Sequence, residues 1–306
     1  MPNKRYRYII LVISFILGLA VGKFYQQYRF NHSVAIRISS PEHEIDYDLK
    51  QAINFLSYQF EKEGFYIAGI SDANDLYPAR LDKAKINLFV RGFTPFYDIR
   101  APKDRINIFY VERTDKQYNE EYTGYDAYWI NQHIIKEKLS PKLKVHYFQS
   151  GAKPRPLLTA NYEYDVLYIS EAYNPYYTQF LRAKYPNSKI YGSTDFGNLP
   201  LTDQQHELSK AKLVVYEMLP NSADDKDFVP FAVYDIIAYG RPCLTNFKAP
   251  LAQQFDNNVF MFRNDAELEK QTEHLLTMPD KVREQKAQTA RKSLKDKKIQ
   301  FIKNLT

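Results

Sequence analysis

The chain has little of what several protein classes require. It has one cysteine among 306 residues, Cys243, so an intramolecular disulfide is excluded. Cys243 lies in an apolar run, which indicates a buried packing residue rather than a nucleophile. The six histidines are scattered without metal-ligand spacing, so we expect no metal site, and no cofactor is implied. There is also no internal repeat and no low-complexity tract.

Glycine is scarce, with 10 residues, whereas tyrosine (26) and phenylalanine (20) are abundant. Core packing explains this aromatic content better than carbohydrate stacking does. With 44% hydrophobic and 25% charged residues, the composition excludes wholesale disorder and allows two domains of ordinary size.

No recognisable nucleic-acid-binding motif accompanies the net charge of +6. Much of the excess positive charge lies near the two ends of the sequence. The expected partners are therefore acidic small molecules or an anionic membrane surface, and no nucleic acid.

An apolar run extends from Ile9 to Gly22 and follows the basic segment Lys4–Arg7. Extended by Tyr8 and, across Lys23, by Phe24 and Tyr25, the apolar stretch reaches about 17 residues, which is barely long enough to span a bilayer as a helix. The alternative is a secretory signal peptide, because Ala20-Val21-Gly22 offers small residues at plausible cleavage positions. The aromatic pair Phe24-Tyr25 follows as an interfacial anchor would. We therefore expect residues 1–30 to form a single-pass membrane anchor.

The orientation of this anchor is contested by two arguments. Three cations precede the apolar run and two, Lys23 and Arg29, follow it, which weakly favours a cytoplasmic N-terminus with the body outside. The opposing argument, for a body on the cytoplasmic face, rests on the chemistry that the segment Tyr234–Leu244 implies. Both orientations stay open at the level of sequence.

The first half of the chain alternates short strands with helices. An amphipathic helix is predicted over Asp48–Glu63 and a second helix over Asn131–Leu139, while residues 31–48 are expected to connect the anchor to a first strand. Further strands are predicted at Tyr66–Ile70, Lys85–Arg91, Ile106–Glu112, Tyr125–Trp129 and Lys144–Phe148. This alternation predicts a parallel sheet covered on both faces, in a domain of residues 31–155.

The Pro-rich segment Gly151–Pro156 is the expected linker to a second unit, residues 156–280. Strands are predicted there at Tyr164–Ser170, Ser188–Gly192, Lys212–Tyr216, Cys243–Asn246 and Asn258–Phe262. Helices are predicted at Tyr176–Lys184, Thr202–Lys210, around Asp235 and at Asp265–Met278. The expected fold class is thus α/β, with two doubly wound, Rossmann-like domains behind an N-terminal transmembrane helix.

The end of the chain is strongly basic. Lys281–Lys303 carries nine Lys or Arg residues and two acids, and residues 281–306 are predicted to form a basic helix. A solvated helix explains this run, and attraction to anionic lipid is the alternative.

The segment Tyr234–Leu244 has the sequence Tyr-Asp-Ile-Ile-Ala-Tyr-Gly-Arg-Pro-Cys-Leu. It predicts an apolar helix that ends at Gly240, followed by a buried strand after Pro242, with Asp235 at the beginning of the helix. The segment resembles the signature of group-1-type glycosyltransferases of the GT-B fold, including the C-terminal domain of the spore-protein glycosyltransferase type. That signature is Phe-Glu-Ala-Leu-Ala-x-Gly-x-Pro-Val-Leu, so Asp235 stands where the family has Glu.

The resemblance implies a nucleotide-sugar site in the second domain. Asp235 would hold the ribose, since a carboxylate accepts the two hydroxyl hydrogen bonds of a diol. The loop from Glu217 to Phe231 and the following helix N-terminus would face the diphosphate. Asp235 could instead serve as a favourable charge near a helix N-terminus. The donor-binding candidates of this domain are Asp235, Ser170, Glu171, Ser222 and Phe231, and Ser170 and Glu171 could equally cap a helix.

The first domain supplies the other candidates. Arg91 and Gly92 follow a predicted strand, where an Arg can clamp phosphate and a Gly permits close backbone approach. Glu112 and Asp115, after the next strand, are the candidate catalytic bases. Relatives carry a His in that loop, whereas this chain has Arg113-Thr114-Asp115.

The resemblance implies a membrane-anchored glycosyltransferase that moves a sugar from a nucleotide-sugar donor to a cell-surface glycan or its lipid-linked precursor. Two alternatives stay open. One is a non-catalytic GT-B domain, suggested by Asp at the Glu position and by the missing His. The other is an exported two-lobed ligand-binding protein, suggested by the charge bias around the anchor.

Overall fold

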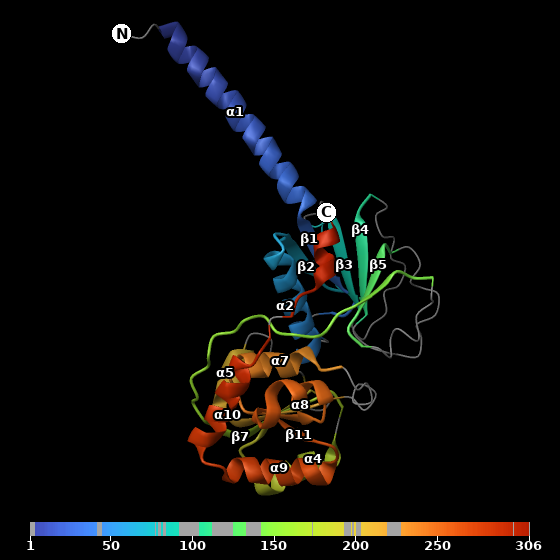
Figure 1. The fold of residues 1–306 in the computed structure, drawn as a ribbon, viewed down its shortest axis with the longest axis vertical. Coiled ribbons are helices and arrows are strands. Elements are labelled where there is room, and N and C mark those ends of the chain that lie inside the picture. Colours follow the sequence, from blue (N-terminus) through green and yellow to red (C-terminus); the bar gives the residue numbers. More distant parts are fainter. Residues whose placement is uncertain are drawn as a thin grey trace.

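The chain forms two parallel sheets, each covered by helices, and a long N-terminal helix that projects from the first (Figure 1). The computed structural model describes residues 4–41, 45–76, 78, 81, 84–91, 104–111, 125–132, 142–172, 174–192, 197, 199, 203–218, 228–295 and 297–305, with side chains from residue 13 onward. Every described strand pair is parallel. The predicted fold of two parallel α/β domains is thereby confirmed.

The first sheet has the order β2-β1-β3-β4-β5-β6. Its strands are β1 (Ser33–Ile38), β2 (Tyr66–Ser71), β3 (Ile86–Arg91), β4 (Ile106–Val111), β5 (Ala127–Ile130) and β6 (Val145–Tyr147). β1 begins two residues after α1 ends, and all six of its residues are buried. The segment expected to be a connector therefore supplies an inner strand of the sheet.

The second sheet has the order β11-β10-β9-β7-β8. Its strands are β7 (Tyr164–Ser170), β8 (Lys189–Tyr191), β9 (Ala211–Glu217), β10 (Cys243–Asn246) and β11 (Phe260–Phe262). These strands match the predicted ones to within two residues at each end. Cys243 is buried, as its apolar surroundings predicted.

The described helices differ in size and role. They are α1 (Lys4–Asn31), α2 (Tyr47–Lys62), α4 (Pro175–Lys184), α5 (Gln204–Lys210), α7 (Phe231–Ala238), α8 (Ala249–Phe255), α9 (Asp265–Thr277), α10 (Asp280–Lys292) and the 3-10 segments η2 (Asp256–Asn258) and η3 (Gln300–Leu305). Most of the helix predicted at Asn131–Leu139 lies outside the described residues.

The projecting helix α1 exposes large apolar side chains, including Phe15, Leu17 and Val21. Among the described residues, however, no helix has the combination of length and apolarity that a bilayer crossing requires. The predicted transmembrane helix is therefore not confirmed.

Gly240 explains why the sequence signature around α7 contains a glycine. Its φ of 72° lies in the left-handed region, where the Gly240 N–H donates to the Ile237 carbonyl and the Arg241 N–H donates to the Ile236 carbonyl. A Cβ on Gly240 would also lie 2.6 Å from Leu157 Cδ1. Glycine is therefore needed both for the turn that ends α7 and for the close passage of the linker.

The two domains meet through α2 and α7, which pack against each other. Phe231, at the start of α7, joins the core of the first domain, where its ring centroid lies 5.5 Å from that of Phe55. Tyr47, at the start of α2, joins the core of the second domain. Each domain thus buries an aromatic side chain of the other, and the junction is part of both cores.

The basic C-terminal run is not one solvated helix. The α-helix α10 buries Arg283, Ala287 and Ala290, and the chain then crosses to the first domain. There, Ile302 is fully buried in the first core, and the Phe301 ring lies edge-on to Trp129 with centroids 4.9 Å apart. The apolar residues within this charged segment are the reason, since they complete a core that the first half of the chain leaves open.

Buried Arg283 holds three elements together. Its Nε donates to the Lys212 carbonyl (2.9 Å), and its Nη1 donates to the carbonyls of Leu275 (2.9 Å) and Met278 (3.1 Å). The Lys212 carbonyl lies in β9, the Leu275 carbonyl lies in α9, and Met278 directly follows α9. Arg283 itself lies in α10, so it joins three elements. One guanidinium therefore satisfies backbone groups that burial would otherwise leave without a donor.

We predict that Arg283→Met destabilises the protein by about 2–4 kcal/mol, because three backbone carbonyls lose a charged donor. The matched control is Arg263→Met, whose side chain is 62% exposed, pairs with Glu267 four residues along the chain and lies 4.2 Å from the centroid of the Phe247 ring. That change should cost about 1 kcal/mol or less. Urea denaturation followed by circular dichroism measures both, and equal losses would contradict the role given to Arg283.

Candidate functional site

Each sheet has a point where its strand order reverses, and the two points face each other. In the first sheet, β1 lies between β2 and β3, and in the second sheet, β7 lies between β8 and β9. Ligands of open α/β sheets bind beyond the carboxyl ends of the strands at such points. The first turn of α2, which follows β1, lies beside the ends of β7 and β9.

A small cavity of about 40 Å³ marks this meeting point. It is lined by Asp46, Tyr47, Asp48, Ile169, Ser170, Glu171, Gly192, Leu199 and Tyr216. Pockets for small-molecule ligands usually enclose roughly 300–1,000 Å³. The cavity is smaller because the first turn of α2 occupies the space between the two switch points.

Asp235 lies at the same junction, in the second turn of α7 rather than at its beginning. Its carboxylate is 1% exposed and accepts two hydrogen bonds, from the Tyr47 hydroxyl (2.8 Å) and from Arg155 Nε (2.6 Å). Burial raises the pKa of Asp235, and the Arg155 guanidinium and the Tyr47 hydroxyl offset part of that rise. The carboxylate thus joins the first domain, the linker and the second domain.

The N-terminus of α7 is capped by the first domain. The residue before α7 is Pro230, which offers no side-chain cap, and the Ala232 N–H donates to Asp48 Oδ1 at 2.7 Å. The first N–H groups of a helix have no partner within the helix, which makes its N-terminus suitable for anions. The Asp48 carboxylate accepts from one of these groups here. Asp48 is 3% exposed, so it forms this bond inside the interface.

Glutamines extend the bridge between the domains. Gln51, one turn along α2 from Tyr47, accepts from Arg155 Nη2 (2.7 Å) and donates through Nε2 to Gln204 Oε1 (2.9 Å). Arg155 also lies over the Tyr239 ring, 5.1 Å from its centroid. Arg155 therefore contacts α2 and α7 at once, from a position in the linker.

The cavity itself is acidic. The buried Tyr216 hydroxyl donates to Glu171, and burial together with Glu171, Asp48 and Asp46 raises the pKa of Tyr216. Ser170 does not cap a helix: its hydroxyl bonds the backbone of Ala172 and closes a turn after β7. An anionic ligand would need to displace the α2 carboxylates or bring positive charge with it.

Gly192 keeps the second-domain side of the cavity open. Its φ is 98°, and a Cβ there would lie 2.1 Å from the Ser170 carbonyl oxygen. Glu217, at the end of β9, accepts hydrogen bonds from Tyr168 and from Asn174 Nδ2 (3.0 Å), and burial raises its pKa. The sequence analysis placed Gly192 at the end of a predicted strand and Glu217 at the start of the loop expected to face the diphosphate, but it named neither as a site residue.

The structure brings together only some of the predicted site residues. Ser170 and Glu171 line the cavity, and Asp235 lies beside it. Phe231 does not face the cavity, because its ring packs in the first core, 6.3 Å from the Phe148 ring. Arg91 ends β3, and its side chain lies outside the described part. Gly92, Glu112, Asp115 and Ser222 also lie outside the described residues.

The key partners of Asp235 were missed by the sequence analysis. Asp48 starts the predicted amphipathic helix and Tyr47 directly precedes it, whereas Arg155 belongs to the predicted linker. The available signal for these residues was that each is a charged or polar side chain near the start of a helix or within the linker. Among the described residues, no group of three or more His, Cys, Asp or Glu side chains is arranged to hold a metal ion.

Comparisons with known proteins identify the fold. No family model and no curated protein matches the sequence. An alpha-glucosyltransferase in complex with UDP and a 13-mer DNA aligns over 85% of this chain and 94% of its own, with a TM-score of 0.58 and 11% identity. The same coverage and identity, with a TM-score of 0.57, are found for an alpha-glucosyltransferase in complex with UDP-glucose and DNA containing an abasic site. At this identity the likeness concerns the fold: the chain has the two-domain GT-B fold of these glycosyltransferases.

Proposed function

We propose that this chain is a glycosyltransferase that takes a sugar from a nucleotide-sugar donor bound between its two domains. The observation that carries the proposal is the convergence of both switch points on Asp235 and the N-terminus of α7. The fold supports it, since the two alpha-glucosyltransferase structures hold UDP or UDP-glucose.

The residues at the junction suit the parts of a nucleoside diphosphate. The N–H groups in the first turn of α7 match the diphosphate once Asp48 releases the Ala232 N–H, and the Asp235 carboxylate matches a ribose diol. Negative charge that develops on the departing diphosphate would be stabilised by the same N–H groups and by nearby arginine. Arg155, which already contacts Asp235, is a described arginine at this place.

Donor binding requires the α2–α7 junction to open. Asp48 holds the Ala232 N–H, while Tyr47 and Arg155 hold both oxygens of Asp235. The first turn of α2 therefore stands where the donor would bind, and a shift of α2 away from α7 frees both groups together. Such a shift is a hinge motion of the kind that two-domain enzymes use to admit substrates.

The acceptor and the location of the reaction are finer parts of the proposal. We propose a cell-surface glycan or a lipid-linked precursor as acceptor, with α1 holding the protein at a membrane and the body on the cytoplasmic side. The exposed apolar side chains of α1 support attachment to a membrane. The need for a nucleotide-sugar, which a bacterium holds in its cytoplasm, supports a body on the cytoplasmic side. Exclusion of nucleic acid stays a prediction, and the DNA in the similar structures belongs to those proteins.

A non-catalytic GT-B domain is the second candidate. It is favoured by the same closed junction, because Asp235 and the α7 N-terminus already have internal partners. In that case the polar bridge would serve to fix the two domains relative to each other. Nucleotide binding separates the two candidates, since a permanently closed junction leaves a cavity of only about 40 Å³.

The first test is thermal stabilisation of the full chain by a panel of nucleoside diphosphates and their sugars. A ligand at about 100 times its dissociation constant should stabilise the folded protein by about 2.7 kcal/mol. We expect one nucleotide to raise the melting temperature, and Asp235→Asn to abolish the response. Asp265→Asn at the exposed start of α9 is the matched control. A flat response of well-folded protein to the whole panel would favour the non-catalytic candidate.

Asp48→Asn should strengthen nucleotide binding, because it removes the negative charge that competes for the N-terminus of α7. A charge at that place is worth about 0.3–2 kcal/mol, so we expect the dissociation constant to fall by about two- to thirtyfold. Glu273→Gln, the same charge change on the surface of α9, should leave it unchanged. Isothermal titration calorimetry measures this, and weaker binding by Asp48→Asn would show that Asp48 assists the ligand rather than excluding it.

Membrane attachment through α1 is tested by flotation of the full chain with vesicles of anionic and neutral lipid. We expect the chain to float with both, because apolar side chains of α1 would enter the bilayer. Replacement of Leu17 and Val21 by Asp should abolish flotation, whereas replacement of the exposed Tyr176 and Val282 in the body should not. Flotation that survives the first pair of changes would assign attachment to another surface.

A further inference from the structure

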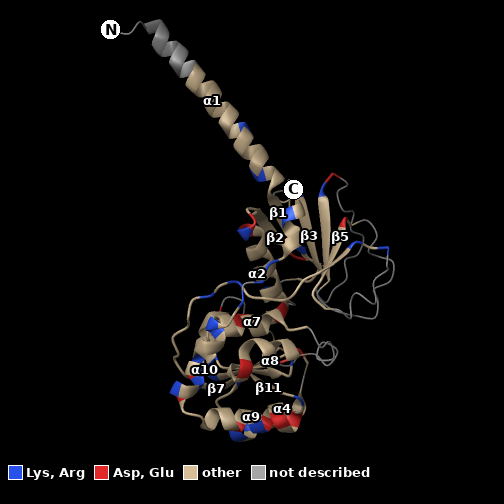
Figure 2. Ribbon diagram, viewed as in Figure 1, with Lys and Arg blue, Asp and Glu red and all other residues tan. Residues whose placement is uncertain are grey.

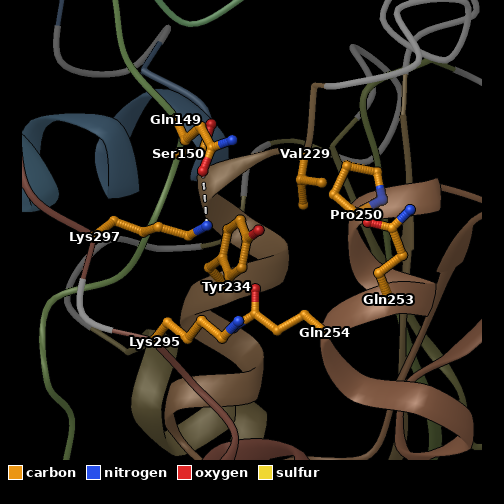
Figure 3. A pocket seen from close by; sticks show the side chains of 9 residues that line it. All are labelled: Gln149, Ser150, Val229, Tyr234, Pro250, Gln253, Gln254, Lys295 and Lys297. Carbon is orange, nitrogen blue, oxygen red and sulfur yellow. Dashed lines mark hydrogen bonds between the residues drawn. The ribbon is translucent and has the colours of Figure 1, made fainter.

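A second pocket lies where the C-terminal segment passes between the domains (Figure 3). Its volume is about 280 Å³, which is seven times the volume of about 40 Å³ of the cavity beside Asp235. The loop after β6, helices α7 and α8 and the segment after α10 all contribute to its wall. The residues that matter below are Gln149, Tyr234, Gln253, Gln254, Lys295 and Lys297.

This pocket is separate from the proposed donor site. Helix α7 turns Phe231 and Asp235, which are four residues apart, toward α2. Tyr234 lies on another face of the same helix and lines the second pocket, beside the C-terminal segment. The proposed transfer reaction uses none of the residues named for this pocket.

The charge of the pocket wall is positive. It contains two lysines, and none of its nine lining residues is acidic. No described carboxylate forms an ion pair with either Lys295 or Lys297, although Asp296, between them in the sequence, lies outside the described residues. Figure 2 shows further basic residues on α10, which leads into this segment.

Lys297 has hydrogen-bonding capacity to spare. Its Nζ donates to Gln149 Oε1 at 2.8 Å, whereas an ammonium has three donors. Burial lowers the pKa of Lys297, and the neighbouring charge of Lys295 lowers it further. Lys295 is exposed, and the partly buried Lys297 ammonium beside it is stabilised when an anion binds between the two.

Neutral donors complete the wall. The hydroxyl of Tyr234 forms no hydrogen bond with any described residue, and burial raises its pKa to about 12, so it remains a donor at neutral pH. Gln253 presents a side-chain amide to the pocket, and Gln254 already donates to the Ser293 carbonyl at 3.2 Å. Ammonium, hydroxyl and amide groups together suit an oxyanion with several acceptor oxygens.

We propose that this pocket binds the phosphate group of a small ligand, held by Lys295, Lys297 and the Tyr234 hydroxyl. The volume exceeds that of a bare phosphate and leaves room for a small polar body near Gln253. Because the wall combines the loop after β6 with α7 and α8, a bound ligand contacts both domains. Binding would therefore stabilise one relative arrangement of the domains.

The test uses the full chain and inorganic phosphate as the probe, with chloride at equal ionic strength as the reference. Isothermal titration calorimetry gives the affinity, and the phosphorus NMR linewidth gives an independent measure. We expect phosphate to bind the unmodified chain, and binding to weaken about tenfold or more when Lys295 and Lys297 are both replaced by Gln, since two charged donors are lost. Tyr234→Phe, which keeps the ring and its packing, should weaken it severalfold.

Three control outcomes keep the proposal open to refutation. Replacement of the exposed Lys292 and Lys298 by Gln removes the same amount of charge nearby and should leave the affinity for phosphate unchanged. An equal loss of affinity would show that phosphate responds to the net charge of this region and not to the pocket. Asp265→Asn at the exposed start of α9 should also leave phosphate binding unchanged. If phosphate binding responds to Asp235 or Asp48 but not to the lysine pair, the anion occupies the proposed donor site and this pocket is not a phosphate site. Failure of nucleotides to bind would leave the phosphate result standing.

Discussion

The burial of one carboxylate at the boundary between the domains constrains much of this molecule. Asp235 is 1% exposed, and an unpaired charge in such a place would be strongly destabilising. Arg155 must therefore reach it from the linker and Tyr47 from α2. These two contacts set the path of the linker and the position of α2 against α7. The same contacts close the space in which the proposed donor would bind, so stability and ligand access oppose each other at a single residue.

The junction and the second pocket use opposite charges on two faces of one helix. The α2 side of α7 meets the carboxylate of Asp48, with Asp46 and Glu171 in the adjoining cavity, whereas another side meets Lys295 and Lys297. A nucleotide at the first place must overcome negative charge, and a phosphate at the second is attracted by positive charge. Since both places contact both domains, ligands at the two would each favour a particular arrangement of the same hinge, and each could alter the affinity for the other.

Much of the fold followed from sequence, but the site followed only in part. Strand β7 was predicted residue for residue, because a buried apolar run bounded by charged turns marks a parallel strand. Asp235 was singled out because the segment Tyr234–Leu244 resembles a glycosyltransferase signature in which an acidic residue holds the ribose. Its partner Tyr47 lies 188 residues away, and Asp48 lies 184 residues from Ala232. Contacts of this kind depend on how two finished domains dock, for which local patterns carry no signal. The crossing of the C-terminal segment, and hence the lysine pocket, escaped prediction for the same reason.

That crossing also orders events during synthesis. The first core contains Ile299 and Ile302, with Phe301 and Leu305 packed against it, and all four leave the ribosome after the whole of the second domain. Until they emerge, Trp129 and Phe148 lack the aromatic cover that Phe301 provides. The domain that is translated first therefore finishes folding last, after the second domain has formed around β7 and β9. A nascent chain stalled before residue 299 should expose this apolar surface and attract chaperones, whereas one released a few residues later should not.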